Sequence, residues 1–309
     1  MVGKKNIRIN KWRNQYIYII ILVLLSLSVF IYSRITKDRR NIDHPNNQIV
    51  EGSMLVHYID VGQGDCMLIQ DGTYNILIDT ASSRMSEKVL TFLYEHDVDS
   101  IDMIVLTHPH EDHIGSFSEI AMNYEIDLVL KSPVERDNYT YIRTENTIED
   151  MDIKSIIPYY GEVFRYGDMM FTVISDSALE YDEINDYSVV LRLDHKGNTF
   201  IFTGDMESDA EHSILEKDVD LECDVLKVAH HGGSSSTTSA FLYETSPIYA
   251  IIQLGADNEY GYPHRTLLSR LDIHDIITYR NDLLGDITVI STVNGLSFEF
   301  EKDVRYDSD

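Results

Sequence analysis

The 309-residue sequence carries 25 basic and 52 acidic residues, a formal net charge of −27, and only two cysteines. The first forty residues hold nine of the bases and one of the acids, so the rest of the chain has 16 basic and 51 acidic residues, a net charge of −35. A surface this acidic excludes ordinary electrostatic binding of nucleic acid, which depends on Lys and Arg neutralising phosphates, unless metal ions offset the charge. Two cysteines exclude a disulfide framework and a thiolate zinc site.

The N-terminal segment predicts one membrane anchor. Residues 16–32, YIYIIILVLLSLSVFIY, are uncharged, aromatic at both ends and flanked by basic residues. The run is near the lower limit for a membrane-spanning helix, roughly 17 residues, and no small-residue cleavage site follows it as in a secretory signal peptide. Basic residues are slightly more numerous before the run than after it, which favours a cytoplasmic tail over residues 1–15. We therefore expect a single-pass protein of the cell membrane with its catalytic part outside.

A polar linker over residues 33–53 is expected to join the anchor to one α/β domain over residues 54–309. Short apolar runs in this part alternate with helical patterns, which is typical of sheets covered by helices. The expected strands are MLVHYID, DCMLIQ, YNILID, IDMIVLT and EIDLVLKS, then the hairpin YSVVLRLDHKGNTFIFTGD, and then CDVLKVA, PIYAIIQL and ITVISTV as a second set. The expected helices are SEKVLTFLYEHD, AEHSILEK and TLLSRLDI.

Four potential metal ligands are crowded into the loop that follows the strand IDMIVL. The loop reads THPHEDHIG and contains His108, His110, Asp112 and His113. Imidazole is the commonest metal ligand in proteins. The spacing suits two neighbouring metal ions, one bound by the first two histidines and the other by Asp112 and His113.

Four later or earlier motifs offer partners for this cluster, because four ligands do not complete two coordination spheres. Asp205 ends the strand NTFIFTGD and is placed to bridge two ions. The histidine pair in AHHGG follows another strand, and GYPH supplies one more histidine before a helix: His230, His231 and His264. Asp79, at the end of YNILID, is expected to orient a metal-bound histidine rather than bind the metal itself.

These motifs together resemble the metallo-β-lactamase superfamily. HPHEDH, preceded by LIDT and followed by TGD and a strand-end histidine, is similar to the superfamily pattern HxHxDH. IDVGQGD, NDYSVVLRL, FTGDMESDAE, DVLKVAHHG and GADNEYGYPH resemble more closely the nuclease-like domain of the ComEC competence proteins and the related phosphorylcholine esterases.

The resemblance implies an αββα sandwich with a dinuclear site at one edge of the paired sheets. It gives His108 and His110 to one ion, Asp112 and His113 to the other, and Asp205 to both. The superfamily usually has one more histidine between HxHxDH and the bridging aspartate, and the single histidine in that interval here is His195, which we do not assign. Its place is expected to be taken by His264 and by one of the two adjacent histidines, His230 or His231, between which the sequence does not decide. Asp60 joins Asp79 as a residue expected to support the ligands.

The expected chemistry is hydrolysis by a hydroxide that bridges two divalent ions, with zinc or manganese as the expected metal. Asp112, His264 and Tyr262 are the expected catalytic residues, and Asn185 and Ser188 are expected to contact substrate. We expect a phosphodiester substrate, either a small molecule or single-stranded DNA. The alternatives are hydrolysis of another ester or amide, such as a lactone or β-lactam, and a pseudoenzyme that binds metal without turnover.

Overall fold

The computed structural model of the protein describes residues 52–302. The expected membrane anchor, residues 16–32, and nearly all of the expected linker lie outside the described residues. Within residues 52–302, no helix is both long and apolar enough to cross a bilayer. The anchor and the outward orientation of the domain therefore stay predictions.

Eight strands form the first sheet. The chain starts as an antiparallel meander, β1–β2–β3, and continues as parallel strands, β4, β5 and β6, which need helical crossovers to run in one direction. Two C-terminal strands complete the sheet beside β1, giving the order β15-β14-β1-β2-β3-β4-β5-β6. The bounds are β1 (Met54–Tyr58), β2 (Met67–Asp71), β3 (Tyr74–Ile78), β4 (Met103–Leu106), β5 (Val129–Lys131), β6 (Ser155–Ile156), β14 (Ile287–Thr292) and β15 (Gly295–Phe300).

Seven strands form the second sheet, in the order β13-β12-β11-β10-β9-β8-β7. Its first four strands along the chain are antiparallel neighbours, and β10 to β13 are parallel. The bounds are β7 (Val163–Tyr166), β8 (Met169–Val173), β9 (Leu191–His195), β10 (Asn198–Phe202), β11 (Val225–Lys227), β12 (Tyr249–Ile252) and β13 (Ile277–Arg280).

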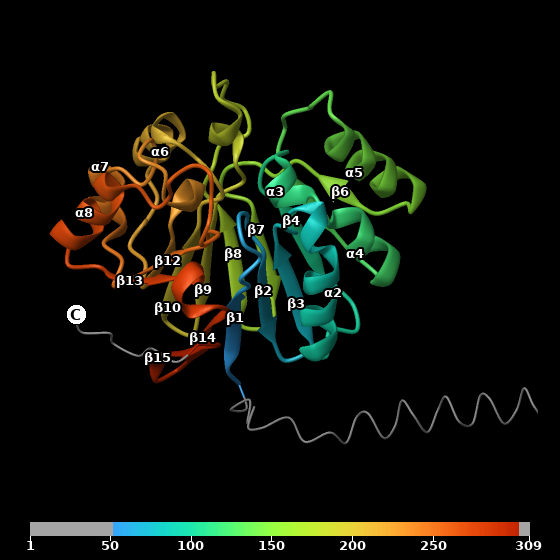
Figure 1. The fold of residues 1–309 in the computed structure, drawn as a ribbon, viewed down its shortest axis with the longest axis horizontal. Helices are drawn as coiled ribbons and strands as arrows, with labels where there is room; N and C mark the ends of the chain where they lie inside the picture. Colours follow the sequence, from blue (N-terminus) through green and yellow to red (C-terminus); the bar gives the residue numbers. More distant parts are fainter. Residues whose placement is uncertain (1–51, 303–309) are drawn as a thin grey trace, which may run out of the picture. The chain divides into compact units, whose positions relative to one another are not determined.

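Helices cover the outer face of each sheet, and the inner faces pack against each other (Figure 1). The first sheet is covered by α2 (Ser86–Glu95), α4 (Phe117–Asn123) and α5 (Tyr139–Asp150), and the second by α6 (Ser208–Leu215), α7 (Ser239–Thr245) and α8 (Arg265–Ile273). Short elements lie in the loops: α3 (Glu111–Ile114), α9 (Asn281–Leu284), η1 (Ser83–Met85), η2 (Ile184–Tyr187) and η3 (Ala229–Gly232). This arrangement confirms the expected αββα architecture.

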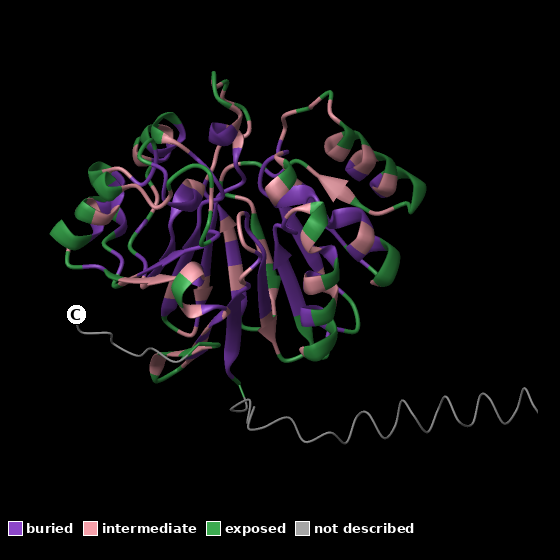
Figure 2. Ribbon diagram, in the orientation of Figure 1, coloured by how far each residue is buried: buried purple, intermediate pink, exposed green. Residues whose placement is uncertain are grey.

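The core between the sheets explains why several strands are apolar on both faces. Val56, Ile78, Phe171 and Phe202 are fully buried between the two sheets, while alternate residues of the same strands pack under the helices. Figure 2 shows the strands buried along most of their length and exposure concentrated on the outer helices. Burial also raises the pKa of both thiols, Cys66 and Cys223, so neither is available as a thiolate.

One strand lies in a different sheet from the one that the sequence predicts. The sequence pattern groups ITVISTV with the second set of strands, but β14 pairs antiparallel with β1 along five residues, from Met54 opposite Ser291 to Tyr58 opposite Ile287. The alternation of buried and partly buried residues in β14 identifies a strand but carries no information about which neighbour it will pair with. Helix α5 and the β7–β8 hairpin are also absent from the predicted elements.

Candidate metal centre

Four strand ends bring the predicted ligands to one edge of the sandwich. Asp79 follows β3, the HPHEDH loop follows β4, Asp205 follows β10, and the histidine pair follows β11. β3 and β4 are parallel neighbours in the first sheet, and β10 and β11 are parallel neighbours in the second. Parallel neighbours end at the same edge. Residues from separate parts of the sequence therefore meet there.

Asp112, His113 and His231 present ligand atoms that all lie within 4.8 Å of one another, and Asp205 lies beside the two histidines. His113 Nε2 lies 3.2 Å and His231 Nε2 3.4 Å from Asp205 Oδ2. Asp112 Oδ2 lies 3.4 Å from His231 Nε2 and 4.0 Å from His113 Nε2. Two ligands on a tetrahedral zinc ion are roughly 3.3 Å apart, given bonds of about 2.0 Å. We call Asp112, His113, His231 and Asp205 the inner set.

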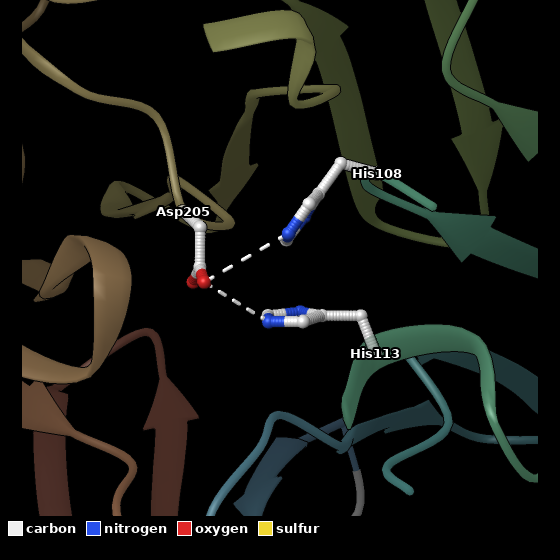
Figure 3. A group of neighbouring side chains, drawn as sticks. All are labelled: His108, His113 and Asp205. Atoms are coloured by element: carbon white, nitrogen blue, oxygen red, sulfur yellow. Dashed lines mark hydrogen bonds and ion pairs between the residues drawn. The ribbon is translucent and has the colours of Figure 1, made fainter. Parts of the chain in front are cut away.

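A second group of donors lies beside the inner set and shares Asp205 with it. His108 Nε2 is 3.8 Å from Asp205 Oδ2 and 2.9 Å from His110 Nδ1. Figure 3 shows that His108 and His113 approach the same carboxylate of Asp205 from two sides. We call His108, His110 and Asp205 the outer set. Within residues 52–302, the ligand atoms of His108 and Asp205 group with His113, and His110 joins them only through its contact with His108. Three donors would leave one position of a tetrahedral ion without a protein ligand.

Two donor atoms of the inner set lack hydrogen-bond partners among the described residues, as expected of atoms that bind a cation. Asp205 Oδ1 and His231 Nε2 are buried and have no hydrogen-bond partner within the described chain. Buried polar atoms without partners are costly, and buried charges are normally paired or bound to metal. Imidazole nitrogens and carboxylate oxygens at this spacing are the ligands of zinc and similar divalent ions.

The inner histidines are fixed by bonds on the nitrogen that faces away from the cluster. His113 Nδ1 donates to Asp79 Oδ2 at 2.8 Å, and Asp79 also accepts from the amide and hydroxyl of Thr107 at 2.8 and 2.7 Å. His231 Nδ1 donates to the Gln253 carbonyl at 3.0 Å. Both rings therefore keep Nε2 directed at the cluster. Asp79 thus contacts His113 on the side away from the cluster, and its role in orienting a metal-bound histidine stays a prediction.

A buried ion pair that the sequence pattern does not predict lies behind His231. Asp65 Oδ1 is 3.3 Å from His231 Nδ1, and the Lys227 ammonium pairs with Asp65 Oδ2. Both side chains are fully buried. Burial opposes the ionisation of Asp65, but Lys227 and His231 hold its pKa below the usual value. The available signal was a lysine inside the apolar strand VLK, because a buried lysine needs a partner.

Gly64 lets the Asp65 loop pack against the metal-binding loop. A β-carbon at Gly64 would lie 2.4 Å from the Asp112 carbonyl oxygen, and its φ of +129° is unfavourable for other residues. The Asp65 amide donates to that same carbonyl at 3.1 Å. The GQGD turn therefore holds Asp65 in contact with His231, on the side of the ring away from the inner set.

The two adjacent histidines point to different places. His230 and His231 both have positive φ, 52° and 51°, a conformation that non-glycine residues adopt mostly at functional sites. His231 joins the inner set. His230 Nδ1 lies 3.3 Å from Glu207 Oε1, and its Nε2 lies 3.2 Å from the Tyr262 hydroxyl. The structure thus brings His231 to the metal ligands and His230 to Tyr262.

His264 is not brought into either donor set. It occupies the N-cap position of α8, and its Nδ1 accepts a hydrogen bond from the Ser234 amide at 3.0 Å. Its ring packs 5.0 Å from that of Tyr262. Within residues 52–302, no group of neighbouring metal-binding atoms includes it. The role of His264 as a ligand stays a prediction, and this arrangement does not favour it.

The remaining predicted residues support the loops around the site. Ser188 Oγ accepts from the Asp205 amide at 3.1 Å and donates to the Asn185 carbonyl at 2.7 Å, while Asn185 Nδ2 donates to Glu207 at 2.9 Å. Both side chains are buried, so their engagement with the protein is better suited to holding Asp205 than to binding substrate. Asp60 accepts from the Gly62 amide at 3.2 Å and lies 3.5 Å from Lys302. Among the described contacts, Asp65 rather than Asp60 reaches a histidine of the inner set.

Comparison with known proteins agrees with this geometry. Residues 59–255 match the family described as the metallo-beta-lactamase superfamily. The chain is 31% identical over 254 residues to ComE operon protein 3 of Bacillus subtilis, covering 75% of this chain and 32% of that protein. It is 27% identical over 292 residues to Recombination protein 2 of Haemophilus influenzae, covering 92% and 32%. It thus spans about a third of the length of these relatives.

A solved structure shares the fold. The structure of CmlA, a diiron beta-hydroxylase from Streptomyces venezuelae, superposes with a TM-score of 0.51 at 11% identity, covering 74% of this chain and 52% of that chain. At this identity, the likeness shows a common fold and not a common reaction.

Proposed function

The chain belongs to the metallo-beta-lactamase superfamily of metal-dependent hydrolases, and from this premise we propose that it hydrolyses phosphodiesters with two divalent metal ions. The observation that carries the proposal is the position of Asp205. Its Oδ2 atom lies within 3.8 Å of nitrogens from both donor sets, which suits a carboxylate shared by two ions.

In this proposal each donor set holds one ion, and Asp205 contributes to both. Two divalent ions bound side by side lower the pKa of water to near neutrality and polarise the oxygen of the bond to be cleaved. The protein contributes orientation. Asp79 and the Gln253 carbonyl hold His113 and His231 with Nε2 directed at the ions, so little rearrangement is needed when they bind.

Tyr262 is the residue that we assign to protonation of the leaving oxygen. Its hydroxyl lies 3.2 Å from His230 Nε2, and His230 Nδ1 lies 3.3 Å from Glu207. Its ring lies 6.5 Å from that of His231, beside the inner set. A proton given up by Tyr262 can be replaced through His230, as general acid catalysis requires.

A phosphodiester is favoured over other substrates for two reasons. An in-line displacement at phosphorus develops charge on both the attacking and the leaving oxygen, which two ions stabilise together. The relatives include proteins named for competence and recombination, processes in which DNA is the natural substrate. Because the domain is strongly acidic, the ions must supply most of the attraction for a phosphate.

The acidic surface also supports a second candidate, hydrolysis of an uncharged ester such as a lactone. A neutral substrate is not repelled by a net charge of −35, which is the value for the chain after residue 40. The same two ions would polarise a carbonyl oxygen instead of a phosphoryl oxygen.

A substrate panel distinguishes these candidates. The full chain, loaded with Zn²⁺ or Mn²⁺, is assayed with bis-p-nitrophenyl phosphate, p-nitrophenyl phosphorylcholine, single-stranded DNA, nitrocefin and a neutral lactone, with Asp205→Asn as the control. We expect metal-dependent turnover of at least one phosphodiester that Asp205→Asn abolishes. Turnover of the lactone or nitrocefin alone would refute the phosphodiesterase proposal. Metal binding without any turnover would favour a pseudoenzyme.

We also propose that residues 16–32 anchor the chain in the cell membrane with the hydrolase domain outside. The support is the uncharged apolar run between two basic groups. Protease added to intact cells should then remove the domain, and complete protection would reverse the proposed orientation.

A further inference from the structure

A second group of metal-binding side chains lies at the opposite end of the sandwich. Asp71 ends β2, His195 ends β9, and Asp168 lies in the turn between β7 and β8. One nitrogen of His195 and one oxygen of each carboxylate lie within 4.8 Å of one another. Asp71 is six residues beyond Asp65 along an extended chain, about 20 Å away. The group is therefore separate from the inner and outer sets.

His195 has a buried nitrogen that the protein does not satisfy. The side chain is fully buried, and Nδ1 lies 2.8 Å from Ser291 Oγ. Nε2 is buried and has no hydrogen-bond partner among residues 52–302. A buried nitrogen without a partner destabilises the fold, so a ligand at Nε2 would remove a cost that is present in the protein alone.

The two carboxylates come from different sheets and are already held together. Asp71 Oδ2 accepts a hydrogen bond from the Asp168 amide at 3.1 Å, which fixes the β7–β8 turn against the end of β2. Lys196 neutralises part of the negative charge, since its ammonium lies 2.9 Å from Asp168 Oδ2. One negative charge remains on the group, and one imidazole with two carboxylates is a zinc-type donor set.

We propose that Asp71, Asp168 and His195 bind one zinc ion that joins the two sheets at the end away from the metal centre. Three protein ligands leave the fourth position of a tetrahedral ion to water. The ion would be structural, because the residues that we assign to hydrolysis all lie at the other end. This also gives a role to His195, the histidine that the usual ligand pattern of the family leaves unexplained here.

The test compares zinc stoichiometry at micromolar free zinc in the full chain. Asp168→Asn is the main variant, because this side chain is 62% exposed and its replacement leaves the core intact. We expect it to bind one equivalent less than the wild type while turnover is unchanged. His231→Ala is the matched comparison and should lose zinc from the metal centre but keep the distal ion.

Two further results decide whether the group is only a cluster of ion pairs. The His195 ring nitrogens, followed by ¹⁵N NMR, should shift on zinc addition in the wild type and in His231→Ala but not in Asp168→Asn. Equal zinc content in the wild type and Asp168→Asn would overturn the proposal, and so would binding that needs millimolar zinc. An equal loss of thermal stability in Asp168→Asn with and without zinc would also overturn it, because the contribution would then come from the Lys196 ion pair alone.

Discussion

The inner and outer donor sets share Asp205 but differ in the hydrogen bonds made by the histidine nitrogens that face away from the cluster. Both inner histidines donate from Nδ1 to a buried oxygen, of Asp79 for His113 and of Gln253 for His231. In the outer set, the contact of His108 Nδ1 within residues 52–302 is the Thr107 hydroxyl, at 3.2 Å, and His110 is partly exposed. If each set binds an ion as proposed, the inner position is oriented before the ion binds and the outer position is oriented less.

The charge state of the imidazoles differs in the same way. Burial opposes protonation of His113, but the Asp205 and Asp79 carboxylates raise its pKa well above the usual range, and Asp205 and Asp65 do the same for His231. Burial and the neighbouring His113 lower the pKa of His108 and of His110. Without metal, these opposite directions favour protonation of the two inner histidines over protonation of His108 and His110. An ion entering the inner set must displace protons.

The largest effect is expected from His231→Ala. This change removes an inner ligand, and turnover should fall by more than about 100-fold, beyond the range seen when only a supporting residue is lost. His230→Ala is the matched comparison within the pair, since it leaves both donor sets intact and removes only the proton supply to Tyr262. Because p-nitrophenolate is a leaving group that needs little protonation, turnover should fall by less than about tenfold. Rates with bis-p-nitrophenyl phosphate and zinc content by elemental analysis check both. If His230→Ala is the more damaging change, the assignment within the pair is reversed.

His110→Ala tests the outer set. It should remove the outer ion and lower turnover by about 100-fold, the upper end of the range for weakened metal sites, while the inner ion stays bound. Elemental analysis should fall from two equivalents at the metal centre to one. Loss of both ions would show that the two positions fill together, and the distinction between a more oriented and a less oriented position would fail.

Lys227→Met tests the ion pair behind the inner set. The substitution leaves Asp65 charged, buried and without its main partner. Asp65 should then attract His231 away from the ion, and the zinc affinity of the inner set should fall by about 10- to 100-fold. Because breaking a buried pair also destabilises the fold by about 3 to 5 kcal/mol, the double variant Asp65→Asn/Lys227→Met is needed. The double variant should recover both thermal stability and zinc affinity, because the unpaired charge on Asp65 is gone. Recovery of stability without zinc affinity would contradict competition by Asp65 for His231.

The sequence pattern places most of the candidate ligands at one edge of the fold, but it does not predict the residues that pack behind them. Each predicted ligand at strand ends follows an apolar run, so the pattern of strands alone locates His108, His113 and Asp205 at one edge of the sandwich. Asp65 and Lys227 lie 162 positions apart, and only the packing of two sheets makes them neighbours. The same limit applies to β14, whose alternation predicts a strand but not its pairing with β1.

The choice within the histidine pair required backbone geometry. Two identical side chains in sequence carry no signal that separates them, and the positive φ of both residues turns the rings in different directions. Local propensity does not predict such conformations, because they are unfavourable in isolation and are imposed by surrounding contacts.

Zinc binding to the inner set should weaken as the pH falls. The raised pKa values of His113 and His231 mean that protons compete with the ion, and each proton displaced weakens apparent affinity about tenfold per pH unit below the pKa. Binding to the outer set, whose imidazoles have lowered pKa values, should change less over the same range. Calorimetric titration in buffers of different ionisation enthalpy measures the protons released. Equal proton release for both ions would contradict the difference in charge state.

The smallest effect is expected from His264→Ala, where the sequence and the structure point in different directions. The outer set lacks a third nitrogen, and the sequence offers His264 for it, but Nδ1 of this residue is occupied by the Ser234 amide and the ring lies in neither donor set. Its loss should therefore lower turnover by less than about tenfold, the lower bound for residues that support a metal ligand, and should leave both ions bound. His212→Ala, an exposed histidine on α6, controls for nonspecific loss of metal. If His264→Ala removes one equivalent of zinc while His212→Ala does not, the segment carrying His264 must move onto the outer ion when it binds. The outer set would then gain His264 as a further ligand when that segment closes. Both sets would have a full set of protein ligands, but the outer set would assemble only when its ion binds.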